Sequence, residues 1–123
     1  MYYFENAPIG FIGLKRDEKT AIAEKYYSNL PKIKEDDLVI ILDPMIATGG
    51  SAIYALKMLK EQKINEKNIL FVSLIAAPEG LAAVKKEFPS INIITHIIDK
   101  GLNKNKYILP GLGDFGDRYF GTI

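Results

Sequence analysis

The sequence has 123 residues and a formal net charge of +1, a length that suits one domain and a charge balance that excludes the basic surface typical of a nucleic-acid-binding protein. It has no cysteine, which excludes disulfides and thiolate zinc sites and fits the cytoplasm. The most apolar stretch, residues 69–77, is far shorter than the roughly 20 residues that cross a membrane, and the N-terminus lacks the basic start of a secretory signal.

The first half of the chain predicts two strands and a helix. Residues 9–14 predict a short strand, and residues 38–42 (Leu-Val-Ile-Ile-Leu) form an apolar run typical of a strand that is buried on both faces. Residues 51–62 predict a helix, because apolar residues recur on one side of it. That apolar stripe comprises Ala52, Ala55, Leu56 and Leu59.

The second half continues the alternation. We expect a strand over residues 69–76, a helix that Pro78 opens and Pro89 ends, and a strand over residues 91–98. The apolar face of this helix comprises Leu81, Val84 and Phe88. This order predicts an α/β fold with a mostly parallel sheet and flanking helices. Ligands of such sheets bind beyond the carboxyl ends of the strands, here the loops after residues 14, 42, 76 and 98.

Two segments, residues 15–37 and 99–123, do not follow the alternation. The first has no clean helical period and the second is rich in glycine and proline, so we expect both to be irregular. A long irregular stretch in a compact domain is usually a functional lid or arm.

The strongest local motif is residues 43–51, Asp-Pro-Met-Ile-Ala-Thr-Gly-Gly-Ser, between a predicted strand and a predicted helix. Gly49 and Gly50 let a ligand approach the backbone, and a side chain at Gly49 is expected to meet that ligand. Free N–H groups at a helix start favour an anion, and Asp43 is placed to accept hydrogen bonds from sugar hydroxyls. The motif predicts a site for a phosphorylated ribose. The alternative is a plain strand–helix turn with Ser51 as the N-cap.

Two other motifs are weak when taken alone. Gly111-Leu-Gly113-Asp-Phe-Gly116 matches the dinucleotide-binding pattern, but only seven residues follow it, too few for the helix and strand that the pattern requires. It is therefore interpreted as a glycine-rich loop. Arg16 could clamp a phosphate, although a solvated surface charge is the simpler interpretation.

We expect the histidine and the aromatic clusters to have structural roles. His96 is the single histidine of the sequence, which also has no cysteine, so we interpret it as structural rather than catalytic. The aromatic clusters are expected to cover a core or an oligomer interface. They comprise Tyr2, Tyr3, Phe4, Tyr26 and Tyr27.

Four blocks of the sequence together resemble the C-terminal part of uracil phosphoribosyltransferase, a glycosyltransferase with the type I phosphoribosyltransferase fold. The blocks are Gly13-Leu-Lys-Arg-Asp17, Asp43-Pro-Met-Ile-Ala-Thr-Gly-Gly-Ser51, Ala76-Ala-Pro-Glu-Gly80 and Tyr107-Ile-Leu-Pro-Gly-Leu-Gly-Asp-Phe-Gly-Asp-Arg118. The resemblance covers nearly the whole chain. It implies transfer of phosphoribosyl from 5-phosphoribosyl 1-pyrophosphate (PRPP) to uracil, giving UMP and pyrophosphate in pyrimidine salvage.

The resemblance also implies the roles of individual residues. The PRPP site would comprise Arg16, Asp43, Pro44, Met45, Ile46, Ala47, Thr48, Gly49, Gly50, Ser51 and Asp114. The uracil site would comprise Ile108, Gly113, Asp114 and Phe115. Residues 1–123 would form a single, partial domain, with an arm at 15–37 and a base-recognition segment at 99–123. No side chain has to act as a covalent nucleophile.

Cofactors and partners follow from the same resemblance. Mg²⁺ would be held through PRPP, GTP would be an allosteric activator, and the chain would form a homo-oligomer without binding nucleic acid or membranes. The family is longer at its N-terminus, where it carries another strand and the Arg-Ala-Gly loop that grips pyrophosphate, and no Arg-Ala-Gly occurs here. We therefore expect poor activity from the chain alone. The alternatives are a non-catalytic PRPP- or nucleotide-binding module and an inactive remnant or assembly subunit.

Overall fold

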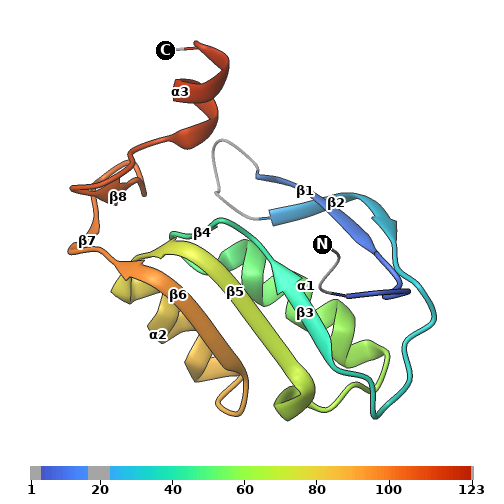
Figure 1. The fold of residues 1–123 in the computed structure, drawn as a ribbon. Helices are drawn as coiled ribbons and strands as arrows, with labels where there is room; N and C mark the ends of the chain where they lie inside the picture. Colours follow the sequence, from blue (N-terminus) through green and yellow to red (C-terminus); the bar gives the residue numbers. More distant parts are fainter. Residues whose placement is uncertain (1–3, 17–22, 123) are drawn as a thin grey trace.

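A parallel sheet lies at the centre of the computed structural model, which describes residues 4–16 and 23–122 (Figure 1). β3 (Val39–Leu42) and β4 (Met45–Ile46) pair with one edge of β5 (Ile69–Ala76), and β6 (Asn92–Ile98) pairs with the other. The predicted α/β class with a mostly parallel sheet is confirmed.

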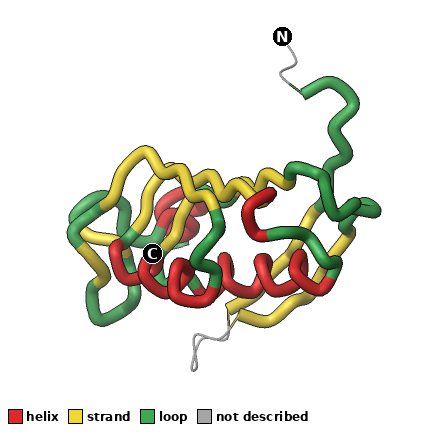
Figure 2. The backbone as a smooth tube through the Cα atoms, turned by 90° about the horizontal axis from the view of Figure 1, so that it is seen from below, coloured by secondary structure: helices red, strands yellow, loops and turns green. Residues whose placement is uncertain are grey.

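Two helices cover one face of this sheet. α1 (Gly50–Glu61) and α2 (Pro78–Glu87) lie behind the central sheet in Figure 1, and Figure 2 shows these helices below the strands of that sheet. α2 begins at Pro78, as predicted. The predicted stripe of α1 is also confirmed, because its four members are buried: Ala52, Ala55, Leu56 and Leu59. No helix in the described part of the chain is long and apolar enough to span a membrane.

The hydrophobic core lies between these helices and the sheet. Ile69 and Phe71 of β5 are each 1% exposed and belong to one buried cluster with Leu56 of α1 and Val84 of α2. Residues that alternate along a strand point to opposite faces, so the core receives every second side chain of β5.

The opposite face of the sheet is open in the described structure. Leu42, Leu74 and Ile94 are 77%, 65% and 56% exposed. The prediction that residues 38–42 are buried on both faces is therefore wrong, because β3 is half-buried at most and Leu42 is exposed. These strands are apolar enough for two covering layers, whereas the described helices α1 and α2 supply one.

An antiparallel hairpin precedes the sheet. β1 (Phe11–Arg16) begins two residues later than predicted and pairs with β2 (Ala23–Asn29). The prediction that residues 15–37 are irregular is wrong for the part that forms β2. Tyr26 and Tyr27 are neighbours in β2 and are both exposed, so this strand shows no apolar–polar alternation that its sequence could reveal.

The aromatic clusters do not cover a core where they are described. Phe4 is exposed, as are both tyrosines of β2, while Tyr2 and Tyr3 lie outside the described residues. The alternative interpretation, an oligomer interface, stays a prediction. His96 is exposed on β6 and is therefore not a core residue.

The C-terminal segment contains three short elements. β7 (Gly101–Leu102) and β8 (Ile108–Leu109) form a two-stranded antiparallel sheet, and α3 (Phe115–Phe120) follows them. The predicted irregularity of residues 99–123 is therefore wrong in part. Elements of two to six residues are too short to produce a recognisable period.

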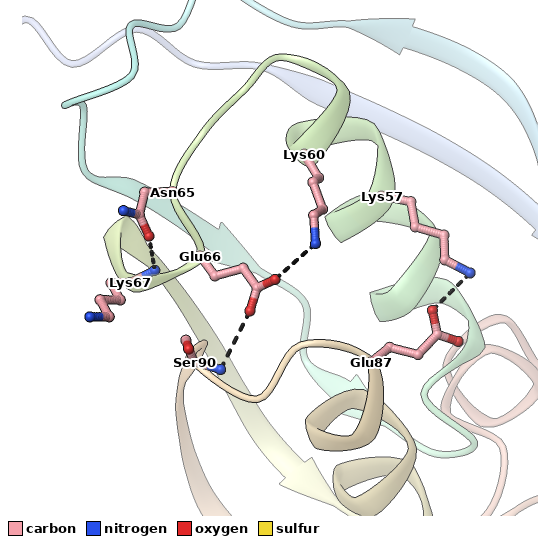
Figure 3. A network of polar contacts seen from close by, with 7 residues as sticks. All are labelled: Lys57, Lys60, Asn65, Glu66, Lys67, Glu87 and Ser90. Atoms are coloured by element: carbon pink, nitrogen blue, oxygen red, sulfur yellow. Dashed lines mark hydrogen bonds and ion pairs between the residues drawn. The ribbon is translucent and has the colours of Figure 1, made fainter.

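A polar network ties the helices together at the end of the sheet where the strands begin (Figure 3). The short turn η1 (Glu66–Asn68) precedes β5. The carboxylate of Glu66 accepts hydrogen bonds from Lys60 Nζ at 3.1 Å and from Ser90 N at 3.4 Å. Lys57 of α1 forms a 2.8 Å salt bridge with Glu87 of α2. The carboxyl ends of the strands lie at the other end of the sheet.

Candidate phosphate- and base-binding site

A cavity of about 200 Å³ lies at the carboxyl ends of the strands. This is the end at which parallel α/β sheets bind ligands. Both predicted binding segments contribute to its lining: the phosphate motif (residues 43–51) and the base-recognition segment (residues 99–123), called the base segment below. The phosphate motif contributes Asp43, Met45, Ile46, Ala47, Gly49 and Ser51, and the base segment contributes Ile108, Gly113, Asp114 and Phe115.

Three of the predicted PRPP residues whose side chains are described do not line this cavity: Pro44, Thr48 and Gly50. Pro44 lies against the sheet, where its carbonyl oxygen accepts hydrogen bonds from Leu74 N and Ile75 N at 3.0 and 3.1 Å. Thr48 Oγ1 accepts a long, 3.4 Å hydrogen bond from Gly50 N. The prediction for Arg16 concerns a side chain outside the described part of the structure.

Part of the phosphate motif (residues 43–51) lies in the sheet rather than in a loop. Met45 and Ile46 form β4, an element that the sequence did not predict. Ile46 is buried, and its carbonyl oxygen accepts a 2.8 Å hydrogen bond from Ala77 N. The loop proper is therefore short, covering residues 47–49, and both of its ends are anchored.

The start of α1 faces this cavity without a capping side chain. Gly49, the N-cap, has no side chain to cap the helix, the described side chain of Thr48 makes only a long contact with the first amide, and the first turn carries no acidic residue. The alternative with Ser51 as the N-cap is wrong, because Ser51 lies inside the first turn and lines the cavity. The first amides of a helix have no partner within the helix, and its dipole favours negative charge there. This arrangement suits a phosphate group.

The backbone geometry of the loop requires glycine at position 49. Its φ of +82° lies in the left-handed region, and a Cβ on it would come within 2.8 Å of Gly80 O. A side chain at this position would thus meet α2, and the expectation that it would also meet the bound phosphate stays a prediction.

Gly80 brings α2 into direct contact with the same loop. A Cβ on Gly80 would overlap the carbonyl oxygen of Ala47 and would lie 2.9 Å from Ile46 Cγ2. The loop and α2 therefore pack through backbone atoms, and only glycine fits between them.

Replacing this glycine should loosen the loop. For Gly80→Ala we expect the free energy of unfolding to fall by about 1–3 kcal/mol, because the added methyl group overpacks the contact. Urea unfolding followed by circular dichroism measures it. Gly50→Ala is the matched control, since the nearest atom to its Cβ would be 3.6 Å away, and its stability should not fall. Equal stability of Gly80→Ala and the parent would contradict the close contact.

The base segment forms the other wall of the cavity. Ile108 is buried, and its carbonyl oxygen accepts a 3.1 Å hydrogen bond from Gly113 N. Asp114 is the N-cap of α3, where its Oδ1 accepts a 2.9 Å hydrogen bond from Asp117 N. Phe115 is 44% exposed and stacks on Tyr119, with ring centroids 5.6 Å apart. The segment thus presents backbone, a carboxylate and an aromatic ring to the cavity.

Two further residues that the sequence did not assign, Lys106 and Tyr107, line the cavity. They end the turn between β7 and β8, in which Asn103 Oδ1 accepts hydrogen bonds from Asn105 N and Tyr107 N. A lysine ammonium suits a phosphate or pyrophosphate. The block that begins at Tyr107 was the signal that could have pointed to Tyr107, whereas Lys106 lies just outside it.

Comparison with known proteins agrees with this geometry. The family model described as uracil phosphoribosyltransferase matches residues 1–122. The chain is 50% identical over 118 residues to a uracil phosphoribosyltransferase of Campylobacter fetus, covering 96% of this chain and 56% of that relative. It is 52% identical over 117 residues to one from Thermosipho melanesiensis, covering 95% and 55%.

A solved structure gives the same result for the fold. A protein from Aquifex aeolicus matches with a TM-score of 0.85 and 43% identity, over 94% of this chain and 54% of that chain. The chain thus spans about half the length of the curated relatives that it matches.

Proposed function

Because this chain belongs to the uracil phosphoribosyltransferase family, we propose that it carries the PRPP- and uracil-binding part of an enzyme that forms UMP and pyrophosphate. The observation that supports this most is the single cavity shared by the 43–51 motif and the 106–115 segment. A ribose phosphate on the first and a base on the second would meet at C1 of the ribose.

The phosphate motif would hold PRPP through its backbone and one carboxylate. The N–H groups at the start of α1 suit the 5-phosphate. Asp43 directly follows β3, and its Oδ1 accepts a 3.3 Å hydrogen bond from Met45 N, which orients the carboxylate for the ribose hydroxyls. Lys106 would pair with phosphate oxygens from the opposite wall.

The reaction would be a displacement at C1 of the ribose. A uracil ring nitrogen would bond to C1 and lose its proton, which the departing pyrophosphate or water accepts, as the C1–O bond to pyrophosphate breaks and positive charge develops on the sugar. The residues that line the cavity would orient the two partners. Orientation alone can lower the activation barrier by several kcal/mol. Backbone groups of residues 108–115 would read the edge of the base, so cytosine would leave buried donors and acceptors unpaired.

Mg²⁺ fits this cavity as a partner of PRPP. Asp43 and Asp114 border the cavity, whereas the described residues contain no cluster of three or more His, Cys, Asp or Glu that could hold a metal ion. Mg²⁺ commonly uses one or two carboxylates together with phosphates and water. When bound, it would neutralise charge on the leaving pyrophosphate. Assembly into a homo-oligomer in the cytoplasm and activation by GTP stay predictions of the family resemblance.

Removing the charge of Asp43 tests the proposed PRPP site. Asp43→Asn should weaken PRPP binding about tenfold in calorimetric titration, because hydrogen bonds to a charged group contribute about 1.5–3 kcal/mol. Asp36→Asn is the matched control, since Asp36 is exposed in the turn before β3, at the other end of this strand. Parental PRPP affinity in Asp43→Asn would refute the assignment of this carboxylate.

A non-catalytic PRPP-binding module is the second candidate, since the chain spans about half the length of its relatives. It predicts PRPP binding without formation of UMP. An inactive remnant would bind neither substrate. An assay of UMP formation beside the PRPP titration separates the three.

A further inference from the structure

Two carboxylates, one directly after β6 and one in α2, hold the later part of the base-recognition segment (residues 99–123). Asp99 follows β6, and its Oδ2 accepts a 2.8 Å hydrogen bond from Gly111 N. Glu79 lies in the first turn of α2, and its Oε1 accepts a 3.0 Å hydrogen bond from Leu102 N. Neither residue lines the cavity described above.

The buried side chain of Ile108 also anchors this segment, but the segment lies outside the main core. β7 and β8 pair with each other and form a sheet separate from the central one. The buried core cluster and the side chains packed against it lie within residues 30–93. The described backbone hydrogen bond from Asp99 N to Ala76 O, 2.9 Å long, ties down only the start of the segment. Among the described contacts, the two carboxylates and the buried Ile108 together hold the part that follows.

The backbone amides that bind these carboxylates lie within or next to residues 108–115, a part of the base segment that lines the cavity. Leu102 pairs with Ile108, and Gly111 is two residues before Gly113. Glycine occurs where each carboxylate approaches: a Cβ on Gly111 would be 2.6 Å from Asp99 Oδ2, and one on Gly101 would be 2.8 Å from Glu79 Oε1. Both contacts depend on a backbone without a side chain.

We propose that Asp99 and Glu79 are positioning residues for base recognition. They hold residues 108–115 at the separation from the 43–51 motif at which the base and the ribose phosphate of one nucleotide fit together. Their effect passes through the amides of Gly111 and Leu102, so it depends on an acceptor oxygen and not on negative charge. This inference rests on the proposed function.

The test compares UMP with ribose 5-phosphate, because the two ligands share the phosphate and ribose and differ in the base. In calorimetric titrations of Asp99→Ala and Glu79→Ala, we expect UMP affinity to fall about tenfold, the effect of one lost hydrogen bond to a charged group. Ribose 5-phosphate affinity should stay within about twofold of the parent, within the spread of ordinary surface substitutions.

Conservative variants separate positioning from general damage. Asp99→Asn and Glu79→Gln keep an acceptor oxygen and should restore most of the UMP affinity. Hydrogen exchange at the Gly111 and Leu102 amides should speed up in the respective alanine variants alone. Glu87→Ala is the matched control, since Glu87 is an exposed acid at the far end of α2 and pairs with Lys57. It should bind both ligands like the parent.

The outcomes are distinguishable. Parental UMP affinity in both alanine variants overturns the inference, and so does an equal loss of affinity for both ligands, which indicates a general structural role. If the parent binds neither ligand, the proposed function itself fails and the inference falls with it. If the parent binds both ligands, an unexpected result with the variants counts against the role of the two carboxylates and not against the proposed function.

Discussion

Adding the remaining part of the family's length to this chain should raise the rate of UMP formation by about 10²–10³-fold, the usual effect of one preorganised anion-binding group. This chain spans 56% of its Campylobacter fetus relative, and the family resemblance places the pyrophosphate-gripping Arg-Ala-Gly loop in the N-terminal region. Contacts that strengthen as charge grows on the leaving group are the ones that accelerate the reaction. The measurement compares UMP formed per protein by residues 1–123 and by a fusion that carries that region.

The same fusion should change solubility through the open sheet face. Leu42, Leu74 and Ile94 are more than half exposed, and an exposed apolar face of this kind favours self-association. Sedimentation should show the fusion less associated than the chain alone. A second fusion with its Arg-Ala-Gly arginine changed to alanine is the control, since it should cover the face equally and lacks only the arginine that binds pyrophosphate. Comparable turnover by the chain and the intact fusion would mean that the N-terminal loop is dispensable.

Deleting residues 111–123 should remove the preference for UMP over ribose 5-phosphate. The deleted part contains Gly113, Asp114 and Phe115, which line the cavity, whereas the core cluster lies within residues 30–93 and should still fold. Losing the base contacts should lower UMP affinity roughly ten- to hundredfold, equivalent to two or three hydrogen bonds. Titration with both ligands measures the effect, and thermal unfolding checks that the core persists.

Phe115→Ala refines this test at a single side chain. Phe115 stands on the cavity wall, so its removal should improve the relative binding of UMP analogues with bulky 5-substituents. Phe120→Ala is the matched control, because Phe120 is an exposed ring of α3 outside the cavity lining. Unchanged selectivity among the analogues would indicate that Phe115 points away from the base.

The elements with a full hydrophobic period were predictable. The α1 stripe follows the helical repeat over three turns, and Pro78 marks the start of α2, so both helices were placed within a residue or so of their observed bounds. The strand at residues 38–42 was correct in kind and wrong in burial. Burial of a strand depends on the layers that cover it, and its own sequence cannot show whether both are present.

The remaining errors concern short or exposed elements. β2 has no buried face that its sequence could reveal, and β4, β7 and β8 are two residues long. At the site, the two glycine-containing segments were found by their motifs, and the structure brings them to one cavity. Lys106 was not predicted, because a lysine in a turn has no distinguishing sequence pattern. The contact between Gly49 and Gly80 was not predicted either, because it joins two elements whose approach no local motif encodes.

The uncapped start of α1 also makes this chain sensitive to its buffer. Amides at a helix start do not distinguish a sugar phosphate from inorganic phosphate or sulfate. An anion that binds only the folded chain raises the free energy of unfolding by RT ln(1 + [L]/Kd), and the same occupancy competes with PRPP. Thermal stability and measured PRPP affinity will therefore move in opposite directions as phosphate is added.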